Sequence, residues 1–88
     1  MVERKIEVIN KLGLHARPAS MLAQKASRFK SEIRLKRDDT EINAKSILGV
    51  MMLAAEVGSY VIVKAEGEDE NQAVEALVQL FAEKFGEE

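Results

Sequence analysis

The chain contains no cysteine and no tryptophan, and it has only one histidine and one proline among its 88 residues. The absence of cysteine excludes disulfide bonds, thiolate nucleophiles and cysteine-bound zinc or iron–sulfur centres. A single histidine is too few for a multi-histidine metal site, and no spacing of carboxylates is typical of a metal-binding loop. We therefore predict that the protein holds no metal and no cofactor, and that its stability comes from a hydrophobic core.

Long apolar runs are absent as well, and so is an excess of positive charge. No window approaches the roughly 18 uninterrupted apolar residues of a membrane span, and residues 1–5 lack the apolar segment of a signal peptide. The 13 basic and 15 acidic residues leave a net charge of −2, which provides no overall positive field for a nucleic acid or an anionic membrane. We expect a cytoplasmic protein without membrane insertion and without direct binding of nucleic acid.

What the chain does contain suits one small domain. Hydrophobic residues make up 47% of the 88 positions, which is enough for one packed core, and the length leaves no room for a second. There is no internal repeat, low-complexity tract or linker composition. We therefore expect a single domain over residues 1–88.

Alternation of apolar and polar residues predicts strands in four places. The expected strands cover residues 2–9, 32–36, 41–43 and 60–66, and the second and third form a hairpin through the turn at 37–40. The segment 60–66 is rich in aromatic and β-branched residues and lies between glycines, which is typical of a central strand.

Apolar residues spaced three and four apart predict helices. The first begins close to Pro18, because proline lacks the N–H that has no intrahelical partner in a first turn, and it runs to about residue 28. A second, short helix covers the apolar run 47–55, with Ser46 as its N-cap and Gly58 beyond its end.

The last helix is expected to follow the acidic residues 68–70, which suit the positive end of a helix dipole. Its apolar face includes Phe81 and Phe85, and Gly86 is expected to release a frayed acidic tail. The elements therefore run β-α-β-β-α-β-α. This order predicts an α+β fold, in which helices cover one face of a small, mostly antiparallel sheet.

The predicted junction between the first strand and the first helix carries residues suited to phosphoryl chemistry. Histidine exchanges its proton near neutral pH, so His15 offers an uncharged nucleophile. Arg17 can hold two phosphate oxygens, and the free N–H groups at the helix start, which Pro18 marks, point into the same space. The same residues also fit an ordinary exposed turn before a helix, and their chemistry alone leaves the choice open.

Two separated motifs resemble those of a known family. Residues 13–19, Gly-Leu-His-Ala-Arg-Pro-Ala, are similar to the active-site signature of HPr, the phosphocarrier of the phosphoenolpyruvate-dependent sugar phosphotransferase system. Residues 43–51 resemble the regulatory-serine region of the same family, and residues 66–70 resemble the entry to its last helix. The similarity extends over essentially all of the chain.

The resemblance implies an open-faced β-sandwich with four antiparallel strands and three helices. It implies that His15 accepts a phosphoryl group on Nδ1 from phosphorylated enzyme I and passes it to a sugar-specific enzyme IIA. Arg17 and the backbone N–H groups of Ala16 and Arg17 would then balance the charge of the phosphoryl group. Such a protein is a co-substrate rather than an enzyme. We expect a monomer, because a carrier must expose its site to successive partners.

Ser46 has two compatible interpretations. A serine directly before an apolar helix is commonly an N-cap, which contributes about 1 kcal/mol. The resemblance adds regulatory phosphorylation of Ser46 by an HPr kinase/phosphorylase, whose product serves a catabolite-control transcription regulator. A phosphate at a helix start is electrostatically tolerated, so we expect the fold to stay intact.

The run after Ser46 holds more apolar side chains than one face of a short helix can bury, so some must face solvent. By resemblance, Ile47, Leu48 and Met51 are expected to dock partner proteins. Leu48 and Met52 differ from the residues common in the family, which would alter partner affinity rather than phosphoryl chemistry. Basic residues such as Lys11, Lys25 and Lys45 either steer acidic partners together with Arg17 or are ordinary solvated charges.

Three other functions fit parts of the pattern. An RNA-recognition-like module shares the order of elements, but it needs several aromatic residues on its strands and this chain has one tyrosine. An acyl-phosphate hydrolase would also place an arginine in a phosphate-binding loop. A regulatory HPr paralogue would act through Ser46 alone, but such paralogues lack the histidine that this chain has at position 15.

Overall fold

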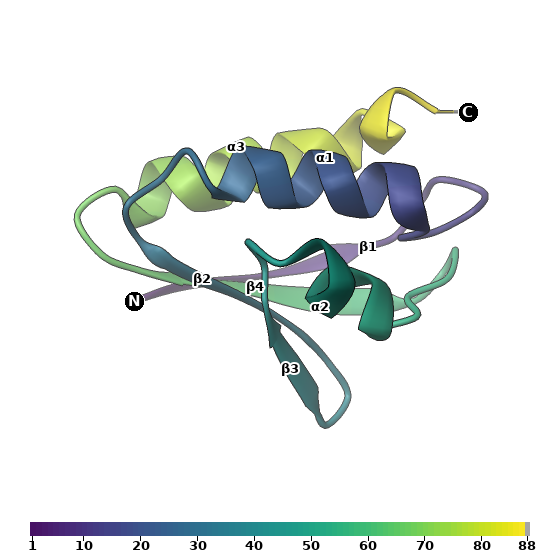
Figure 1. Ribbon diagram of the computed structural model, residues 1–88, viewed down its shortest axis with the longest axis horizontal. Helices are drawn as coiled ribbons and strands as arrows, with labels where there is room; N and C mark the ends of the chain where they lie inside the picture. The colour runs from purple at the N-terminus through teal and green to yellow at the C-terminus, as the bar shows by residue number, and fades with distance from the viewer. Residues whose placement is uncertain (88) are drawn as a thin grey trace.

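The computed structural model describes residues 1–87 and contains a four-stranded sheet with helices packed on one of its faces (Figure 1). The strands are β1 (Val2–Glu7), β2 (Glu32–Arg37), β3 (Thr40–Asn43) and β4 (Tyr60–Glu66). The helices are α1 (Ala16–Ala26), α2 (Ile47–Met52) and α3 (Glu70–Ala82), followed by a short 3₁₀ turn, η1 (Lys84–Gly86). This order confirms the predicted α+β fold and its open-faced β-sandwich.

β4 lies at the centre of the sheet, as the sequence predicts. The strand order is β1-β4-β2-β3, and all neighbouring strands are antiparallel. Along β4, Val61, Val63 and Ala65 are buried, whereas Tyr60 and Ile62 alternate with them and face the opposite way. The helices therefore cover the face that carries the valines, and the other face of the sheet stays open.

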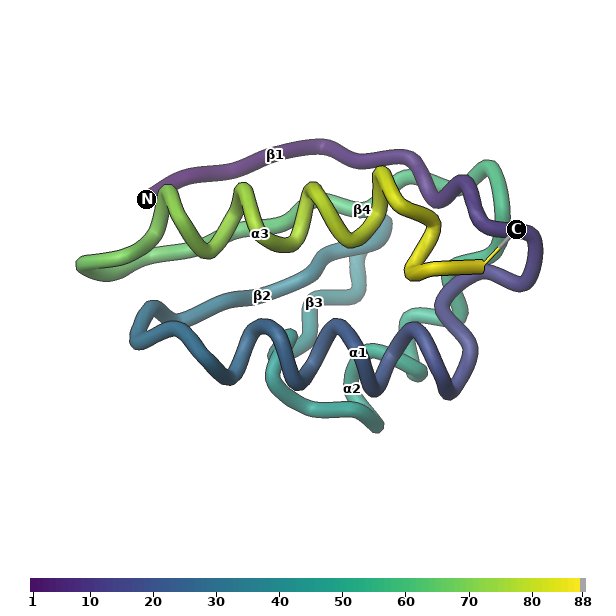
Figure 2. The backbone as a smooth tube through the Cα atoms, turned by 90° about the horizontal axis from the view of Figure 1, so that it is seen from above, coloured from purple at the N-terminus to yellow at the C-terminus, as the bar shows by residue number. Residues whose placement is uncertain are grey.

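The hydrophobic core lies between the sheet and the pair α1 and α3. Seen from above, α3 runs along β1 and β4 and α1 runs beside it, while α2 packs against α1 near β3 (Figure 2). The buried stripe of α1 consists of Pro18, Ala19, Leu22, Ala23 and Ala26, and that of α3 consists of Ala73, Val74, Leu77, Leu80 and Phe81. Within residues 1–87, no helix has the length and hydrophobicity needed to cross a bilayer.

The first strand and the first helix end earlier than predicted, whereas the helix starts where it was expected. β1 ends at Glu7 rather than at residue 9, because the chain turns at Asn10, whose side chain donates to a carbonyl in the turn. α1 begins at Ala16, which confirms the prediction that the helix starts close to Pro18 with the proline in its first turn. The helix then ends at Ala26 rather than at residue 28.

The ends of the other two helices also differ from expectation. α2 ends at Met52 rather than at residue 55, and Ala54 beyond it has a left-handed φ of +50° that no right-handed helix accepts. α3 ends at Ala82, so the prediction that Phe85 lies on its apolar face is wrong. Phe85 instead has a φ of +54° and is buried, with its ring edge to face against Phe81 at 4.9 Å between centroids.

The residue after η1 is not frayed, contrary to the expectation for the segment beyond Gly86. The N–H of Glu87 donates to the carbonyl of Lys84 at 2.8 Å, and only 14% of the Glu87 side chain is exposed. The acidic composition of this segment favoured a solvated tail, but its side chain finds partners far away in the sequence. Glu88, which belongs to the same expected tail, lies outside the described residues.

Asp69, at the start of α3, forms hydrogen bonds with the loop between α1 and β2. Its Oδ2 accepts the backbone N–H of Lys30 at 2.9 Å, and its Oδ1 accepts the backbone N–H of Ser31 at 2.9 Å together with the Ser31 hydroxyl. Gly67 permits this approach, because a Cβ there would lie 2.7 Å from the Cα of Ser31. The Ser31 hydroxyl, followed by the Lys30 N–H, lowers the pKa of Asp69 from 3.8 to about 2.

Asp69→Asn is expected to lower the melting temperature at neutral pH and to lose this effect in acid. Because folding depresses the pKa of Asp69, its carboxylate stabilises the fold fully above its ordinary pKa of 3.8, and the contribution disappears as the pH falls toward 2. Thermal unfolding followed by circular dichroism between pH 7 and pH 2 measures the difference between the two proteins.

The matched control is Asp39→Asn, at an exposed turn position. It should melt like the parent protein throughout this range. A destabilisation by Asp69→Asn that persists unchanged at the acid end would contradict an ionised role for Asp69.

Candidate functional site

His15 is the N-cap residue of α1, and its side chain is free for other contacts. Its backbone is extended, with φ −75° and ψ −172°, and its carbonyl accepts the N–H of Ala19 at 2.9 Å as the first bond of the helix. The imidazole makes no capping hydrogen bond, and 35% of the side chain is exposed. The ring therefore stands at the open end of the helix, within reach of solvent and of a partner.

The start of α1 can bind an anion next to this ring. N–H groups in the first turn have no intrahelical partner, and Pro18 has no N–H at all, so Ala16 and Arg17 supply the free ones. The Arg17 side chain is 58% exposed and lies on the same turn. The structure thus brings together His15, Arg17 and the two amides that the sequence singled out.

The turn before His15 is held rigidly against a second loop. Gly13 has a φ of +67°, and a Cβ there would collide with the carbonyl oxygen of Ala55. The N–H of Leu14 donates to that same carbonyl at 2.8 Å, and the buried Asn10 side chain donates to the carbonyl of Gly13 at 2.8 Å. These contacts fix the backbone that leads to His15.

Glu87 completes the site, and the sequence analysis missed it. Its Oε2 lies 2.9 Å and its Oε1 3.1 Å from Nε2 of His15, and Oε2 also accepts from Nη1 of Arg17 at 3.3 Å. Asn10 Nδ2 donates to Oε1 at 3.0 Å. The hydrogen bond from Asn10, followed by those from His15 and Arg17, lowers the pKa of Glu87 below 4.5.

The carboxylate of Glu87 determines which ring nitrogen of a neutral His15 carries the lone pair. A carboxylate accepts hydrogen bonds, so the neutral imidazole places its proton on Nε2 and donates it to Glu87. The lone pair then lies on Nδ1, the nitrogen that carries no recorded partner among residues 1–87. The geometry therefore favours attack through Nδ1, and the ring orientation is held from the opposite side.

Asn10 was also missed, and no local pattern could have revealed its role. It is fully buried, and both hydrogen bonds of its Nδ2 bridge the turn before His15 to Glu87. In sequence it is one polar residue in a turn-prone stretch, where asparagine is common for local reasons. Only the approach of residue 87 turns it into part of the site.

A shallow hollow of about 240 Å³ lies beside His15 and extends toward α2. Its walls are mostly apolar and are formed by Leu12, Leu14, His15, Met51, Ala54, Ala55 and Glu56. Leu12 is largely exposed at the rim, and the sequence analysis did not single it out. A partner's side chain can therefore reach the imidazole along an apolar path.

α2 confirms the predicted N-cap at Ser46 and the predicted solvent-facing apolar residues after it. The Oγ of Ser46 accepts the N–H of Gly49 at 3.0 Å, so Ser46 is confirmed as the N-cap. Val50 is buried, whereas Leu48 is 73% exposed and Ile47 and Met51 are also exposed. The expected surplus of solvent-facing apolar residues is therefore present, and Met51 reaches the hollow beside His15.

Several basic residues have contacts within the fold rather than only with water. Lys45 Nζ donates to the carbonyl of Phe29 at 2.8 Å, and Arg34 pairs with Glu32 at 3.1 Å. Arg17 is likewise paired with Glu87, at 3.3 Å, but 58% of its side chain stays exposed. Within the described part of the chain, no group of three or more histidine and carboxylate side chains could hold a metal ion.

Comparison with known proteins identifies the family. Residues 2–83 match the family described as "PTS HPr component phosphorylation site", so the chain belongs to the HPr phosphocarrier family. Phosphocarrier protein HPr of Treponema pallidum is 50% identical over 88 residues, which cover 100% of both chains. HPr-like protein Crh of Bacillus subtilis is 46% identical over 84 residues, which cover 96% of this chain and 99% of Crh.

Solved structures of the family have the same fold. A crystal structure of HPr from Thermoanaerobacter tengcongensis is 51% identical, has a TM-score of 0.96 and is matched over 100% of this chain and 99% of that one. A crystal structure of Bacillus subtilis Crh, described as a dimer with a swapped domain, is 46% identical with a TM-score of 0.76 and is matched over 96% and 97% of the two chains. The family resemblance and the fold are thus confirmed, and dimeric relatives exist.

Asn10→Ala is expected to raise the pKa of Glu87 toward 4.5 by more than Arg17→Ala does. The hydrogen bond from Asn10 is the largest of the effects that hold this pKa down. Carbon-13 NMR of the side-chain carboxyl groups, titrated from neutral pH into acid, measures the value in each variant.

Asn71→Ala, an exposed asparagine at the start of α3, is the matched control and should leave the pKa of Glu87 unchanged. An equal or larger rise in Arg17→Ala would show that charge, rather than the buried amide, governs the Glu87 carboxylate.

Proposed function

We propose that the protein is a cytoplasmic phosphocarrier of the phosphoenolpyruvate-dependent sugar phosphotransferase system. His15 accepts a phosphoryl group from phosphorylated enzyme I and passes it to a sugar-specific enzyme IIA. The chain acts as a single-domain, monomeric co-substrate over residues 1–88, and it is not an enzyme in its own right. The family to which the chain belongs supports this role, and the acceptor geometry supplies its chemistry.

The observation that carries the proposal is the imidazole of His15 at the open end of α1, with Nε2 on Glu87 and Nδ1 without a hydrogen-bond partner among residues 1–87. In the transfer, the Nδ1 lone pair attacks phosphorus, the Nδ1–P bond forms, and the bond from phosphorus to the donor breaks. The ring keeps its Nε2 proton and becomes cationic, and the ionised Glu87 opposes that charge. Arg17 and the amides of Ala16 and Arg17 face the phosphoryl oxygens.

This modest set of contacts suits a carrier. One exposed arginine and two amides stabilise a phosphoryl group without enclosing it, and His15 lies in an open hollow rather than in a closed pocket. If the carrier held the phosphoryl group too tightly, the phosphorylated carrier would be more stable than the phosphorylated next acceptor. Transfer onward would then be unfavourable. The partner proteins therefore supply the remaining stabilisation of the transition state.

Ser46 provides a second, regulatory role in the same proposal. An HPr kinase/phosphorylase would phosphorylate its hydroxyl, and the product would bind a catabolite-control transcription regulator. The similarity to Crh supports this role, as does the exposed α2 surface, which we define as Ile47, Leu48 and Met51. Phosphorylation would place about two negative charges beside this surface and so change which partners dock there.

Incubation with phosphoenolpyruvate, magnesium and enzyme I is expected to place one acid-labile phosphoryl group on His15. Intact-mass measurement and peptide mapping identify the modified residue, and His15→Ala should remain unmodified. An unmodified parent protein, with an enzyme I that phosphorylates another HPr in parallel, would refute the carrier role. Arg17→Ala should slow the transfer by about tenfold, because it removes one charged contact to the phosphoryl group.

Phosphorylation of Ser46 is expected to leave cooperative unfolding intact. Ser46→Ala loses the N-cap, which costs about 1 kcal/mol and lowers the melting temperature by about 4–8 °C in a domain of this size. The phosphorylated protein should melt no lower than Ser46→Ala, as followed by circular dichroism. Loss of the cooperative transition would contradict this, and modification of Ser46→Ala by the kinase would place the regulatory site elsewhere.

A further inference from the structure

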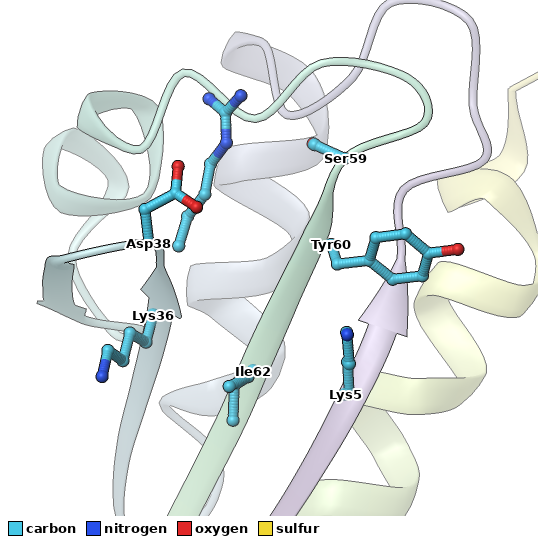
Figure 3. A pocket seen from close by; sticks show the side chains of 7 residues that line it. Lys5, Lys36, Asp38, Ser59, Tyr60 and Ile62 are labelled. Carbon is cyan, nitrogen blue, oxygen red and sulfur yellow. The ribbon is translucent and has the colours of Figure 1, made fainter.

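The open face of the sheet carries a hollow that the phosphocarrier role does not use. It encloses about 450 Å³, compared with about 240 Å³ beside His15. Figure 3 shows it from close by, with Lys36 and Asp38 on one side of β4 and Lys5 with the Tyr60 ring on the other. The lining residues are Lys5, Lys36, Arg37, Asp38, Ser59, Tyr60 and Ile62.

The strand register gathers these side chains into one place. Ile62 on β4 pairs with Lys5 on β1 and with Lys36 on β2, so the three form a row across the sheet. The buried valines of β4 alternate with Ile62 and face the helices, so this row faces the uncovered side. Tyr60 lies two residues before Ile62 on β4, lines the same hollow and is 52% exposed.

The hollow is positively charged in a chain whose net charge is negative. Three cations and one carboxylate line it, which gives a local charge of +2 against −2 for the whole chain. Within residues 1–87, Lys5, Lys36 and Arg37 form no ion pair, whereas the neighbouring Lys64 pairs with Glu41 at 2.9 Å. Glu41 lies opposite Lys36 in the β2–β3 register but pairs with Lys64, so the three cations of the hollow carry no ion-pair partner among the described residues.

Two of these cations are also held in position. The Lys5 ammonium lies 4.8 Å from the centre of the Tyr60 ring, and Arg37 Nη1 donates to the carbonyls of Leu53 and Ala54 at 3.0 and 2.7 Å. The remaining guanidinium N–H groups of Arg37 are unused by these two bonds. Because the fold already restrains these two side chains, an anion that binds them causes a smaller loss of side-chain entropy.

Two of the lining side chains, Ile62 and Tyr60, add apolar surface between the charges, which suits a ligand with a carbon skeleton better than a bare ion. Ile62 is half-buried between the lysines, and the Tyr60 ring offers a flat face beside it. The volume suits a small molecule rather than a folded partner, since ligand sites commonly measure about 300–1,000 Å³. A ligand with a dianionic group and a short carbon skeleton would use both the charges and this apolar surface.

We propose that this hollow binds a small phosphate monoester. Its phosphate would lie among Lys5, Lys36 and Arg37, and its carbon skeleton would rest on Ile62 and the Tyr60 ring. The binding is non-covalent and is independent of phosphoryl transfer through His15. It would allow the carrier to sense a phosphorylated metabolite on the face opposite its helices.

The test is an amide NMR titration of the whole protein and of His15→Ala with glycerol 3-phosphate at constant ionic strength. Saturable shifts are expected at residues 36–38 and 59–62 in both proteins, with millimolar affinity. Inorganic phosphate should bind several-fold more weakly, and glycerol should produce no shifts. Tyr60 is the only tyrosine and there is no tryptophan, so the tyrosine fluorescence gives a second readout from this hollow alone.

Lys5→Met and Lys36→Met should each weaken binding by about threefold, and the double variant by roughly tenfold, because each removes one positive charge from the hollow. Lys25→Met, which removes a lysine from α1, is the matched control and should bind like the parent. The proposal is overturned by an absence of saturable shifts, by shifts centred on residues 15–17, or by equal losses in the control and the double variant. None of these outcomes depends on whether enzyme I phosphorylates His15.

Discussion

The pairing of β4 on both of its edges is the constraint on which the remaining structure depends. One edge holds β1 and the other holds β2, so residues from the beginning and the middle of the chain meet on one strand. The pairing extends past β1, where the N–H of Val8 donates to the carbonyl of Ser59 at 2.8 Å. This continuation brings the turn at Asn10–Gly13 onto the loop at residues 53–58, and His15 takes its position from that contact.

Local patterns predict those parts of the fold whose causes are local. The alternation along β4 follows from burial of one face, and Ser46 caps α2 because its oxygen meets an N–H three residues on. His15 and Arg17 could be selected because their side-chain chemistry is unusual beside a helix start. Each of these inferences needs only a short window of sequence and one general rule of backbone or side-chain chemistry.

The rest could not be predicted, because its causes join distant residues. Phe85 continues the apolar spacing of α3 in sequence, yet it lies beyond the end of the helix. The positive φ angles at Lys84 and Phe85 change the direction of the backbone, and the ring is buried from this non-helical position. Such backbone angles are uncommon outside glycine, so no rule based on residue type would place them there. Glu87 and Asn10 acquire their roles only through contact with each other, across 77 positions of sequence.

The contact between Glu87 and His15, 72 positions apart, also makes the order of the His15 imidazole depend on complete folding. A chain that has formed α1 alone would present an imidazole free to rotate and to place its proton on either nitrogen. The ordered tautomer requires β1 on β4, the buried rings of Phe81 and Phe85, and the turn after α3 at the same time. In the proposed phosphocarrier, reactivity at Nδ1 would therefore be a property of the finished tertiary structure rather than of α1 alone.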